Sequence, residues 1–543
     1  MNVSAWMLVL TVAVPLAMLL ACSWKPVRDR MLTWLPLGAL PGLLAALLAV
    51  RDENWVFGSP RFPLAFAMDR AGGALLGVAA LLWLAGGWYA AACQVAQPAR
   101  VRFAVCWLMT LTGCLGVFVV ADMVSLYALL GLLSVGATGL IIHDSSPRAL
   151  RAGGVYIGMA LLAESLLLAA FVLIVVSAPG NTLLIADAPA AIAVSAWRDT
   201  ILGLLIIGFG IKAGMVPFHF WMPLAYSAAP IPAAAVMSGA VVKASVIGLI
   251  RFVPFDAAPW NIGTAVTAVG LFGALYGVLI GITQRHPKTV LAYSSVSQMG
   301  MIIAIIGMGM VVGKVEAGLI AAFYAVNHVL SKGALFMAVG VAAETGRRRL
   351  WTVLLPAGVL AIGLGGLPLS GGALTKAVAK ALFGEGVAGM LATVSAIGTT
   401  VLMLHFLRCL KAFAADDPEA RAESGLRWPW LLMATASMVV PWVVYLMSPR
   451  YSLPDALSPY ALWAAMWPIV VGIVLAWVLV NWKRRLPEVP SGDVLIVLAP
   501  IGRCIARGVS DVAVALDTAL RRWPLTGWVL LGLLLAFAVA VRT

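Results

Sequence analysis

The chain alternates between long apolar runs and short polar loops. Sixteen runs are each long enough to cross a bilayer as a helix, which takes about 20 residues. No polar stretch of 100 residues interrupts them, so we expect transport or catalysis within the membrane or on partner subunits. The predicted spans cover about residues 4–22, 31–50, 71–94, 102–120, 122–142, 152–178, 200–221, 230–254, 261–283, 289–312, 317–341, 352–375, 387–411, 428–448, 459–482 and 524–541.

The composition excludes several classes of protein. Of the 543 residues, 63% are hydrophobic and 11% are charged, whereas a soluble domain has about 45–50% and 25%. A soluble globular enzyme, a disordered protein and a fibrous protein are therefore excluded. The six cysteines include no CxxC pair, which favours buried apolar cysteines over a disulfide framework or an iron–sulfur site. We find no motif for a metal, a cofactor or a nucleic acid.

The net charge of +14 is unevenly distributed among the loops. Basic residues concentrate after odd-numbered spans, as in the loops around Lys25, Arg148 and Lys483. The positive-inside rule then places both termini on the outer side of a bacterial-type inner membrane. The first 22 residues lack a basic leader, so we interpret them as a retained span and not as a signal peptide.

One segment near the C-terminus is amphipathic. Between Leu498 and Leu520, apolar residues recur in steps of three and four, and charged residues such as Arg503 and Asp511 occupy the other face. This pattern predicts a lateral helix in the membrane interface, before a final anchor at 524–541. The helix is either a plain surface helix or a strut against a neighbouring subunit.

A few ionisable residues are predicted to lie inside the membrane, where a charge costs about 2.5–3.5 kcal/mol on insertion scales. They are Glu164, Lys212, Lys243, Lys332 and Lys376. A lysine can change its protonation state on burial, whereas an arginine stays charged. One lysine alone could reach the interface with its long side chain, but four in separate spans favour a path for protons.

Two spans are interrupted by glycine and proline. The seventh contains Gly208 to Pro217 around Lys212, and the twelfth contains Gly363 to Gly372 before Lys376. A discontinuous helix at membrane depth is tolerated where it lines a polar cavity. Interruptions at matching places in two halves, about 102–254 and 261–411, indicate two inverted repeats of five spans with the transport site between them.

Two histidines lie close to these lysines in the sequence. His328 precedes Lys332 by four residues, which puts both on one helix face. This favours a proton relay over a histidine that only packs in the core. His219 ends the first broken span. Packing between aromatic residues and a part in proton entry are equally open for it.

These residues resemble the antiporter-like membrane subunits shared by respiratory complex I, Mrp-type cation/proton antiporters and complexes of the hydrogenase-4 and formate hydrogenlyase type. The resemblance covers about residues 100–411. Its motifs occur in a fixed order, and several stretches carry it: GIKAGMVPFHFWMPLAYSAAPIPAAAVMSGAVVKASVIGLIR from Gly210, LAYSSVSQMG from Leu291, NHVLSKGALF from Asn327, GLPLSGGALTK from Gly366 and HFLR from His405.

The resemblance implies an all-α polytopic fold with a core of about fourteen helices, two inverted five-helix repeats and two broken helices. The C-terminal lateral helix and anchor would bring the total to about sixteen spans. The expected divisions are 1–100 for N-terminal helices, 101–254 and 255–411 for the two half-channels, 412–482 for additional helices, and 483–543 for the lateral helix and anchor.

The resemblance also assigns roles in proton transfer. Lys212 would be the pump lysine of the first half, and Lys243 would bridge the halves. His328 and Lys332 would form the relay of the second half, and Lys376 would lie on the exit side.

Two departures from the family pattern stand out. The acid expected nine residues after Asp122 is absent, because Gly131 occupies that position. We therefore expect Glu164, one span later, to pair with Lys212, although a purely structural acid is the alternative. The loop before LAYSS carries His286 where the family has aspartate.

The sequence thus predicts a proton-translocating subunit of a larger membrane complex, with no redox site of its own. Its partners would be other membrane subunits, the lipid bilayer and protons, with sodium as an alternative ion. Three other functions remain open. They are a stand-alone or Mrp-type Na⁺/K⁺–proton antiporter, a membrane subunit of an inorganic-carbon uptake complex, and a scaffold that no longer pumps.

Overall fold

The structure is a computed structural model that describes residues 3–49, 54–59, 62–94, 99–257, 259–481, 489–490, 492 and 494. By its internal contacts the chain divides into two units, Met1–Ser491 and Gly492–Thr543. The predicted lateral helix at 498–520 and the anchor at 524–541 lie outside the described residues. The account below concerns the first unit.

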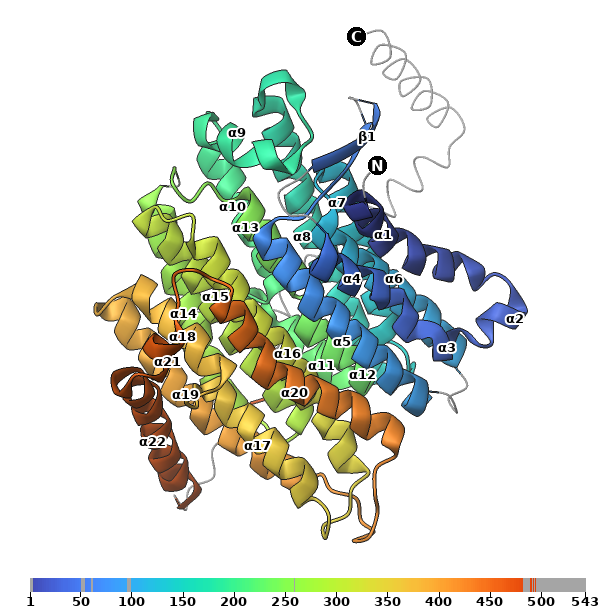
Figure 1. Cartoon of the computed structure of the whole chain (residues 1–543), viewed down its shortest axis with the longest axis vertical. Coiled ribbons are helices and arrows are strands. Elements are labelled where there is room, and N and C mark those ends of the chain that lie inside the picture. The colour runs from blue at the N-terminus through green and yellow to red at the C-terminus, as the bar shows by residue number, and fades with distance from the viewer. Residues whose placement is uncertain are drawn as a thin grey trace, which may run out of the picture. The chain divides into compact units, whose positions relative to one another are not determined.

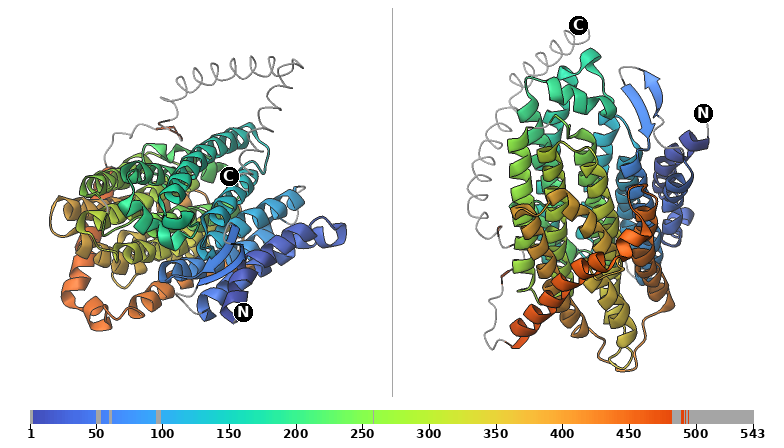
Figure 2. Two further views of the ribbon diagram at one scale, coloured as in Figure 1. Left: turned by 90° about the horizontal axis from the view of Figure 1, so that it is seen from above. Right: turned by 60° about the vertical axis from the view of Figure 1, so that its left-hand side comes forward.

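The described part is built almost entirely of long apolar helices that run side by side (Figures 1 and 2). Fourteen helical segments in it are long and apolar enough to cross a membrane. Many apolar side chains on their outer faces are exposed, among them Leu161, Val176 and Trp477. A polytopic integral membrane protein presents such faces to lipid, so the predicted all-α membrane fold is confirmed.

The N-terminal helices precede the first repeat and include one feature that the sequence did not reveal. A two-stranded antiparallel hairpin joins the second and third spans. The elements are α1 (Val3–Ala21), α2 (Lys25–Arg28), α3 (Met31–Trp34), η1 (Leu35–Ala39), α4 (Leu40–Leu48), β1 (Asn54–Ser59), β2 (Phe62–Ala67) and α5 (Arg70–Gln94).

Asp122 holds this hairpin against the first repeat. Its carboxylate accepts hydrogen bonds from the backbone N–H of Ser125 at 2.7 Å and of Ala65 at 2.9 Å. The first bond caps the helix that follows Asp122, and the second ties strand β2 to the same point. The carboxylate is fully buried, so both bonds offset the cost of its burial.

The first repeat contains five spans, of which the fourth is broken. Its elements are α6 (Arg100–Val119), α7 (Met123–Ile141), α8 (Pro147–Ser177), η2 (Pro179–Asn181), η3 (Ile185–Asp187), α9 (Ala188–Val194), α10 (Arg198–Ala213), η4 (Phe218–Phe220), α11 (Trp221–Ala228), α12 (Ile231–Val236), the π-turn η5 (Met237–Val241) and α13 (Lys243–Phe252).

The second repeat follows the same order, again with a broken fourth span. Because five spans is an odd number, the second repeat starts from the opposite side of the membrane and is inverted. Its helices are α14 (Trp260–Gly281), α15 (Pro287–Val312), α16 (Ala317–Ala343), α17 (Trp351–Gly365), α18 (Gly371–Phe383) and α19 (Val387–Lys411). The chain continues with α20 (Ser424–Leu446), α21 (Leu453–Leu457) and α22 (Pro459–Asn481).

Helix α16 occupies the centre of the described unit. It packs against α5, α12, α15, α17, α18 and α20, and its membrane-length core is entirely buried. Close neighbours such as α14 and α15 approach through glycine. A Cβ on Gly270 would lie 2.5 Å from the backbone nitrogen of Ala304, so only glycine permits this separation.

Candidate functional site: a row of buried lysines

The first broken span positions Lys212 in the last turn of α10. Gly214 follows in the left-handed conformation, with φ of 72°, and ends the helix. The indole N–H of Trp221 donates to the carbonyl of Ile211 at 2.9 Å, which fixes the half-helix that follows the break. A lysine at a helix C-terminus interacts favourably with the helix dipole.

Lys212 forms an ion pair with Glu164 of α8. Its Nζ lies 2.8 Å from Oε1 of Glu164, and the two side chains are only 10% and 11% exposed. Ser134 of α7 completes the cluster, because its hydroxyl donates to Glu164 at 2.6 Å and accepts from Lys212 at 3.0 Å. The pairing expected from the sequence is therefore present, and Gly131 of α7 faces open space.

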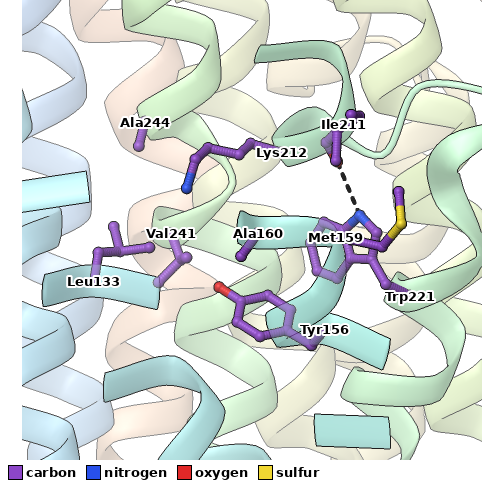
Figure 3. A pocket seen from close by; sticks show the side chains of 9 residues that line it. All are labelled: Leu133, Tyr156, Met159, Ala160, Ile211, Lys212, Trp221, Val241 and Ala244. Carbon is purple, nitrogen blue, oxygen red and sulfur yellow. Dashed lines mark hydrogen bonds between the residues drawn. The ribbon is translucent and has the colours of Figure 1, made fainter. Parts of the chain in front are cut away.

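A small cavity lies beside this ion pair (Figure 3). Its volume is about 20 Å³, which is room for one water molecule. The residues that line it include Leu133, Tyr156, Lys212, Val241 and Ala244. Figure 3 shows the ammonium group of Lys212 and the hydroxyl of Tyr156 pointing toward Val241. Val241 and Ala244 lie two residues before and one residue after Lys243 in the chain.

Lys243 follows the π-turn Met237–Val241. The packing of this turn accounts for the presence of Ser238 and Gly239. The carbonyl of Ser238, within the turn, accepts a hydrogen bond from Nζ of Lys243 at 3.5 Å. The hydroxyl of Ser238 bonds to that of Ser295 at 2.8 Å. A Cβ on Gly239 would collide with Leu82 at 2.2 Å, so glycine lets the turn pack tightly. Such π-turns are frequent at functional sites.

The two halves meet where Lys243 contacts His328. Nζ of Lys243 lies 2.6 Å from Nδ1 of His328, and both side chains are fully buried. The contact is favourable when one of these nitrogens donates and the other accepts, so it disfavours the state in which both side chains are charged. Lys332 lies one turn further along α16, and its Nζ donates to the carbonyl of Leu291 at 2.9 Å.

Lys376 lies in the second broken span. The left-handed Gly366 ends α17 at φ of 112°, and Ser370 caps the start of α18. Nζ of Lys376 donates to the carbonyl of Gly365, the last residue of α17, at 2.6 Å. The lysine also lines a cavity of about 550 Å³ among α16, α18, α19, α20 and α22.

His219 lies in the short segment after the first break. Its ring is fully buried and packs edge-on against Tyr276, with ring centroids 5.0 Å apart, and near Tyr293 at 6.3 Å. Aromatic packing is one of the two roles that the sequence left open for His219. The other role, in proton entry, stays a prediction.

An ion pair at the end of α13 holds the N-terminal region against the first repeat. Arg251, at the end of α13, pairs with Asp69 at 2.7 Å and donates to the carbonyls at the end of α6. Burial opposes ionisation of Asp69, but Arg251 and the backbone N–H of Gly72 lower its pKa below the usual value. The ion pair therefore joins the hairpin region to the helix that carries Lys243.

His286 is the N-cap of helix α15. Its Nδ1 caps the helix by accepting from the backbone N–H of Lys288 at 3.2 Å. The amino group of Lys288 donates to the carbonyl of Ala229 at 2.7 Å, which ties the second half to the first. Burial, Lys288 and Arg148 lower the pKa of His286 to about 4, so it is neutral and able to cap at pH 7.

The sequence did not single out the hydroxyl of Ser134 or the tyrosines at positions 156 and 324. Serine is common in membrane helices and gives no signal by itself. The spacing of Tyr324, four residues before His328, is a signal that could have been used. In the described part of the chain, no group of three or more His, Cys, Asp or Glu residues could hold a metal ion.

Comparison with known proteins agrees with this architecture. The family model described as NADH:quinone oxidoreductase/Mrp antiporter, transmembrane, matches residues 120–379. Hydrogenase-4 component B of Escherichia coli (strain K12) is 39% identical over 149 residues, 25% of this chain and 22% of that protein. NADH-quinone oxidoreductase subunit N of Desulforudis audaxviator (strain MP104C) is 32% identical over 320 residues, 55% of this chain and 62% of that protein.

The chain therefore spans less than two thirds of either relative. Among solved structures, a chain of the Mrp complex from Dietzia sp. DQ12-45-1b has a TM-score of 0.71 at 21% identity and covers 88% of this chain and 100% of its own length. At that identity the likeness shows the fold. Residues 120–379 thus match the membrane family of NADH:quinone oxidoreductases and Mrp antiporters, and the chain has the fold of the solved Mrp chain.

Proposed function

We propose that this chain is the proton-translocating, antiporter-like subunit of a multi-subunit membrane complex. Protons would pass from the Glu164–Lys212 pair to Lys243 and His328, then to Lys332 and finally to Lys376. The contact between Lys243 and His328 carries this proposal. It is a 2.6 Å link between two titratable groups in the fully buried centre, and each group comes from a different half.

The first step would depend on the ion pair of Lys212. While Glu164 lies beside it, the ammonium form of Lys212 is stabilised. A change of charge in a neighbouring subunit would draw the carboxylate away, and burial would then favour release of the proton. The cavity beside Lys212 has room for one water molecule, which could pass this proton toward Lys243.

The middle of the row is suited to hand a proton between the halves. An ammonium on Lys243 can donate to a neutral His328, and a neutral Lys243 can accept from an imidazolium. Two positive charges 2.6 Å apart in a buried site repel each other strongly. A proton that reaches Lys243 would therefore displace one from His328 toward Lys332.

The partners we propose are other membrane subunits of the same complex. The relatives support this, since one is a component of a hydrogenase, one is a subunit of a quinone oxidoreductase, and the solved neighbour lies in an Mrp complex. We place the complex in a bacterial-type inner membrane with both termini outside. Reporter fusions at the C-terminus test that orientation, and a cytoplasmic signal would contradict it.

A second candidate is a subunit of an Mrp-type Na⁺/K⁺–proton antiporter, which the fold of the solved Mrp chain favours. The two functions differ in their dependence on cations. If proton flux in vesicles needs Na⁺ or K⁺ on the opposite side, the antiporter is favoured. If flux persists when both are replaced by choline, proton translocation alone is supported.

The direct test uses the assembled complex in membrane vesicles. Proton flux is driven by an imposed electrical potential or by the native reaction of the complex, and a trapped pH dye reports it. Lys212→Ala and Lys332→Ala should each reduce flux at least tenfold while the complex still assembles. Flux that survives both substitutions would rule out the lysine row as the proton path.

A further inference from the structure

Tyr324 extends the row of titratable groups along α16. It lies four residues before His328 and eight before Lys332, so all three share one face of the helix. Tyr324 is only 2% exposed. Unlike His328 and Lys332, it also lines the cavity of about 550 Å³ that contains Lys376. It therefore lies between the buried centre and this cavity.

The hydroxyl of Tyr324 is held in a defined position. It donates to Oε1 of Gln298 on α15 at 2.9 Å. The amide of Gln298 donates to the hydroxyl of Thr399 on α19 at 3.3 Å, and Thr399 donates to the carbonyl of Ser395 at 2.8 Å. Ser395 lines the same cavity. A chain of hydrogen bonds thus runs from Tyr324 across three helices of the second repeat.

The first repeat has a tyrosine at the matching place. Tyr156 lies on α8, the third span of that repeat, eight residues before Glu164. Tyr324 lies on α16, the third span of its repeat, eight residues before Lys332. Each tyrosine lines the cavity beside the lysine of its own half, Lys212 or Lys376. Because the repeats are inverted, the two tyrosines lie toward opposite sides of the membrane.

We propose that Tyr324 is the relay group through which the buried lysine row opens onto the cavity of Lys376. This inference rests on the proposed function. The phenol oxygen accepts the proton that leaves His328 or Lys332, directly or through water, and the phenol gives its own proton to the cavity. One proton enters and one leaves, so no charge remains on the tyrosine. In the observed position the hydroxyl proton points to Gln298, so the exchange requires the hydroxyl to rotate away from Gln298 and toward the cavity.

The test compares substitutions at position 324 in vesicles that contain the assembled complex. Tyr324→Phe removes only the hydroxyl and should reduce proton flux at least tenfold. Tyr324→His restores a group that donates and accepts protons, and it should recover at least a third of the flux. A role in ring packing alone predicts the reverse order, because phenylalanine preserves the ring better than histidine does.

Tyr445→Phe is the matched control. Tyr445 lines the same cavity from α20 and stacks on Tyr451 with ring centroids 4.8 Å apart, and its hydroxyl has no part in the proposed relay. We expect this variant to keep wild-type flux. Assembly is checked for every variant by co-purification of the partner subunits, so a loss of flux is not confused with a loss of protein.

The outcomes separate this inference from the proposed function. If Lys332→Ala abolishes flux while Tyr324→Phe leaves it unchanged, the lysine row stands and the tyrosine relay is overturned. If Lys332→Ala leaves flux unchanged, both proposals fail. If Tyr324→Phe and Tyr445→Phe lose flux equally, the hydroxyl of Tyr324 has no special role, which also overturns the relay.

Discussion

The substitution Glu164→Gln tests the ion pair on which the first half depends. Nζ of Lys212 lies 2.8 Å from the carboxylate, and both side chains are about nine-tenths buried. At an effective dielectric constant of about 20, unit charges at this distance attract by about 6 kcal/mol. Desolvation offsets part of this attraction. Removal of one partner of a buried pair costs about 3–5 kcal/mol, because the remaining charge is left uncompensated.

Glutamine preserves the size of the side chain and can still accept a hydrogen bond from Ser134, so we expect the fold to survive. The substitution destabilises the ammonium form of Lys212, because its buried charge loses the carboxylate partner. A change of 3 kcal/mol corresponds to roughly a hundredfold change in an equilibrium constant, since about 1.4 kcal/mol is tenfold. We therefore expect proton flux at pH 7 to fall at least tenfold.

The assay measures the initial rate of internal pH change in vesicles that hold equal amounts of the complex. The native reaction of the complex supplies the driving force, with choline in place of Na⁺ and K⁺. Glu419→Gln is the control, because Glu419 pairs with Arg348 at an exposed site, where an ion pair contributes little. A rate for Glu164→Gln within twofold of the wild type, with assembly intact, would refute a functional ion pair.

Three further substitutions test the scaffold through thermal unfolding in detergent. Gly277→Ala should lower the unfolding midpoint, because the added Cβ would lie 2.6 Å from the backbone of α15. Such overpacking costs about 1–3 kcal/mol. Gly154→Ala is the control and should leave the midpoint unchanged, because nothing lies within 4 Å of the added Cβ. Arg251→Met should also lower it, because Asp69 and three carbonyls lose their donor; an unchanged midpoint would show that this ion pair is dispensable.

His286→Asn should weaken the pH dependence of the unfolding midpoint in the same thermal assay. The pKa of His286 is about 4 in the folded protein and near 6.5 when unfolded, so stability falls as pH drops from 6.5 toward 4. By pH 5 the loss is about 1 kcal/mol after discounting for partial exposure. Equal slopes for wild type and variant would contradict this.

The membrane spans could be predicted from the sequence because each is a local signal. A run of apolar residues of bilayer length requires a helix wherever it lies in the chain. The span predicted at 387–411 is the helix Val387–Lys411. The hairpin at 54–67 could not be predicted in this way. It depends on a buried carboxylate, Asp122, more than fifty residues away, and its strands are too short to stand alone.

Part of the candidate site could also be predicted from the sequence, and part of it could not. The cost of burying charge singled out the lysines and Glu164, and the structure places Glu164 on Lys212. The contact between Lys243 and His328 could not be inferred, because it depends on how the two halves pack. The π-turn at Met237–Val241 is likewise a product of tertiary packing. Tyr324 could have been identified from its spacing to His328 and Lys332.

The central claim is that protons cross between the halves at Lys243. Lys243→Met preserves the length of the side chain and removes its charge, whereas Lys314→Met does the same at an exposed loop position. Proton flux is measured in vesicles with matched amounts of assembled complex. We predict at least a tenfold loss for Lys243→Met and wild-type flux for Lys314→Met. Wild-type flux in Lys243→Met would contradict the account.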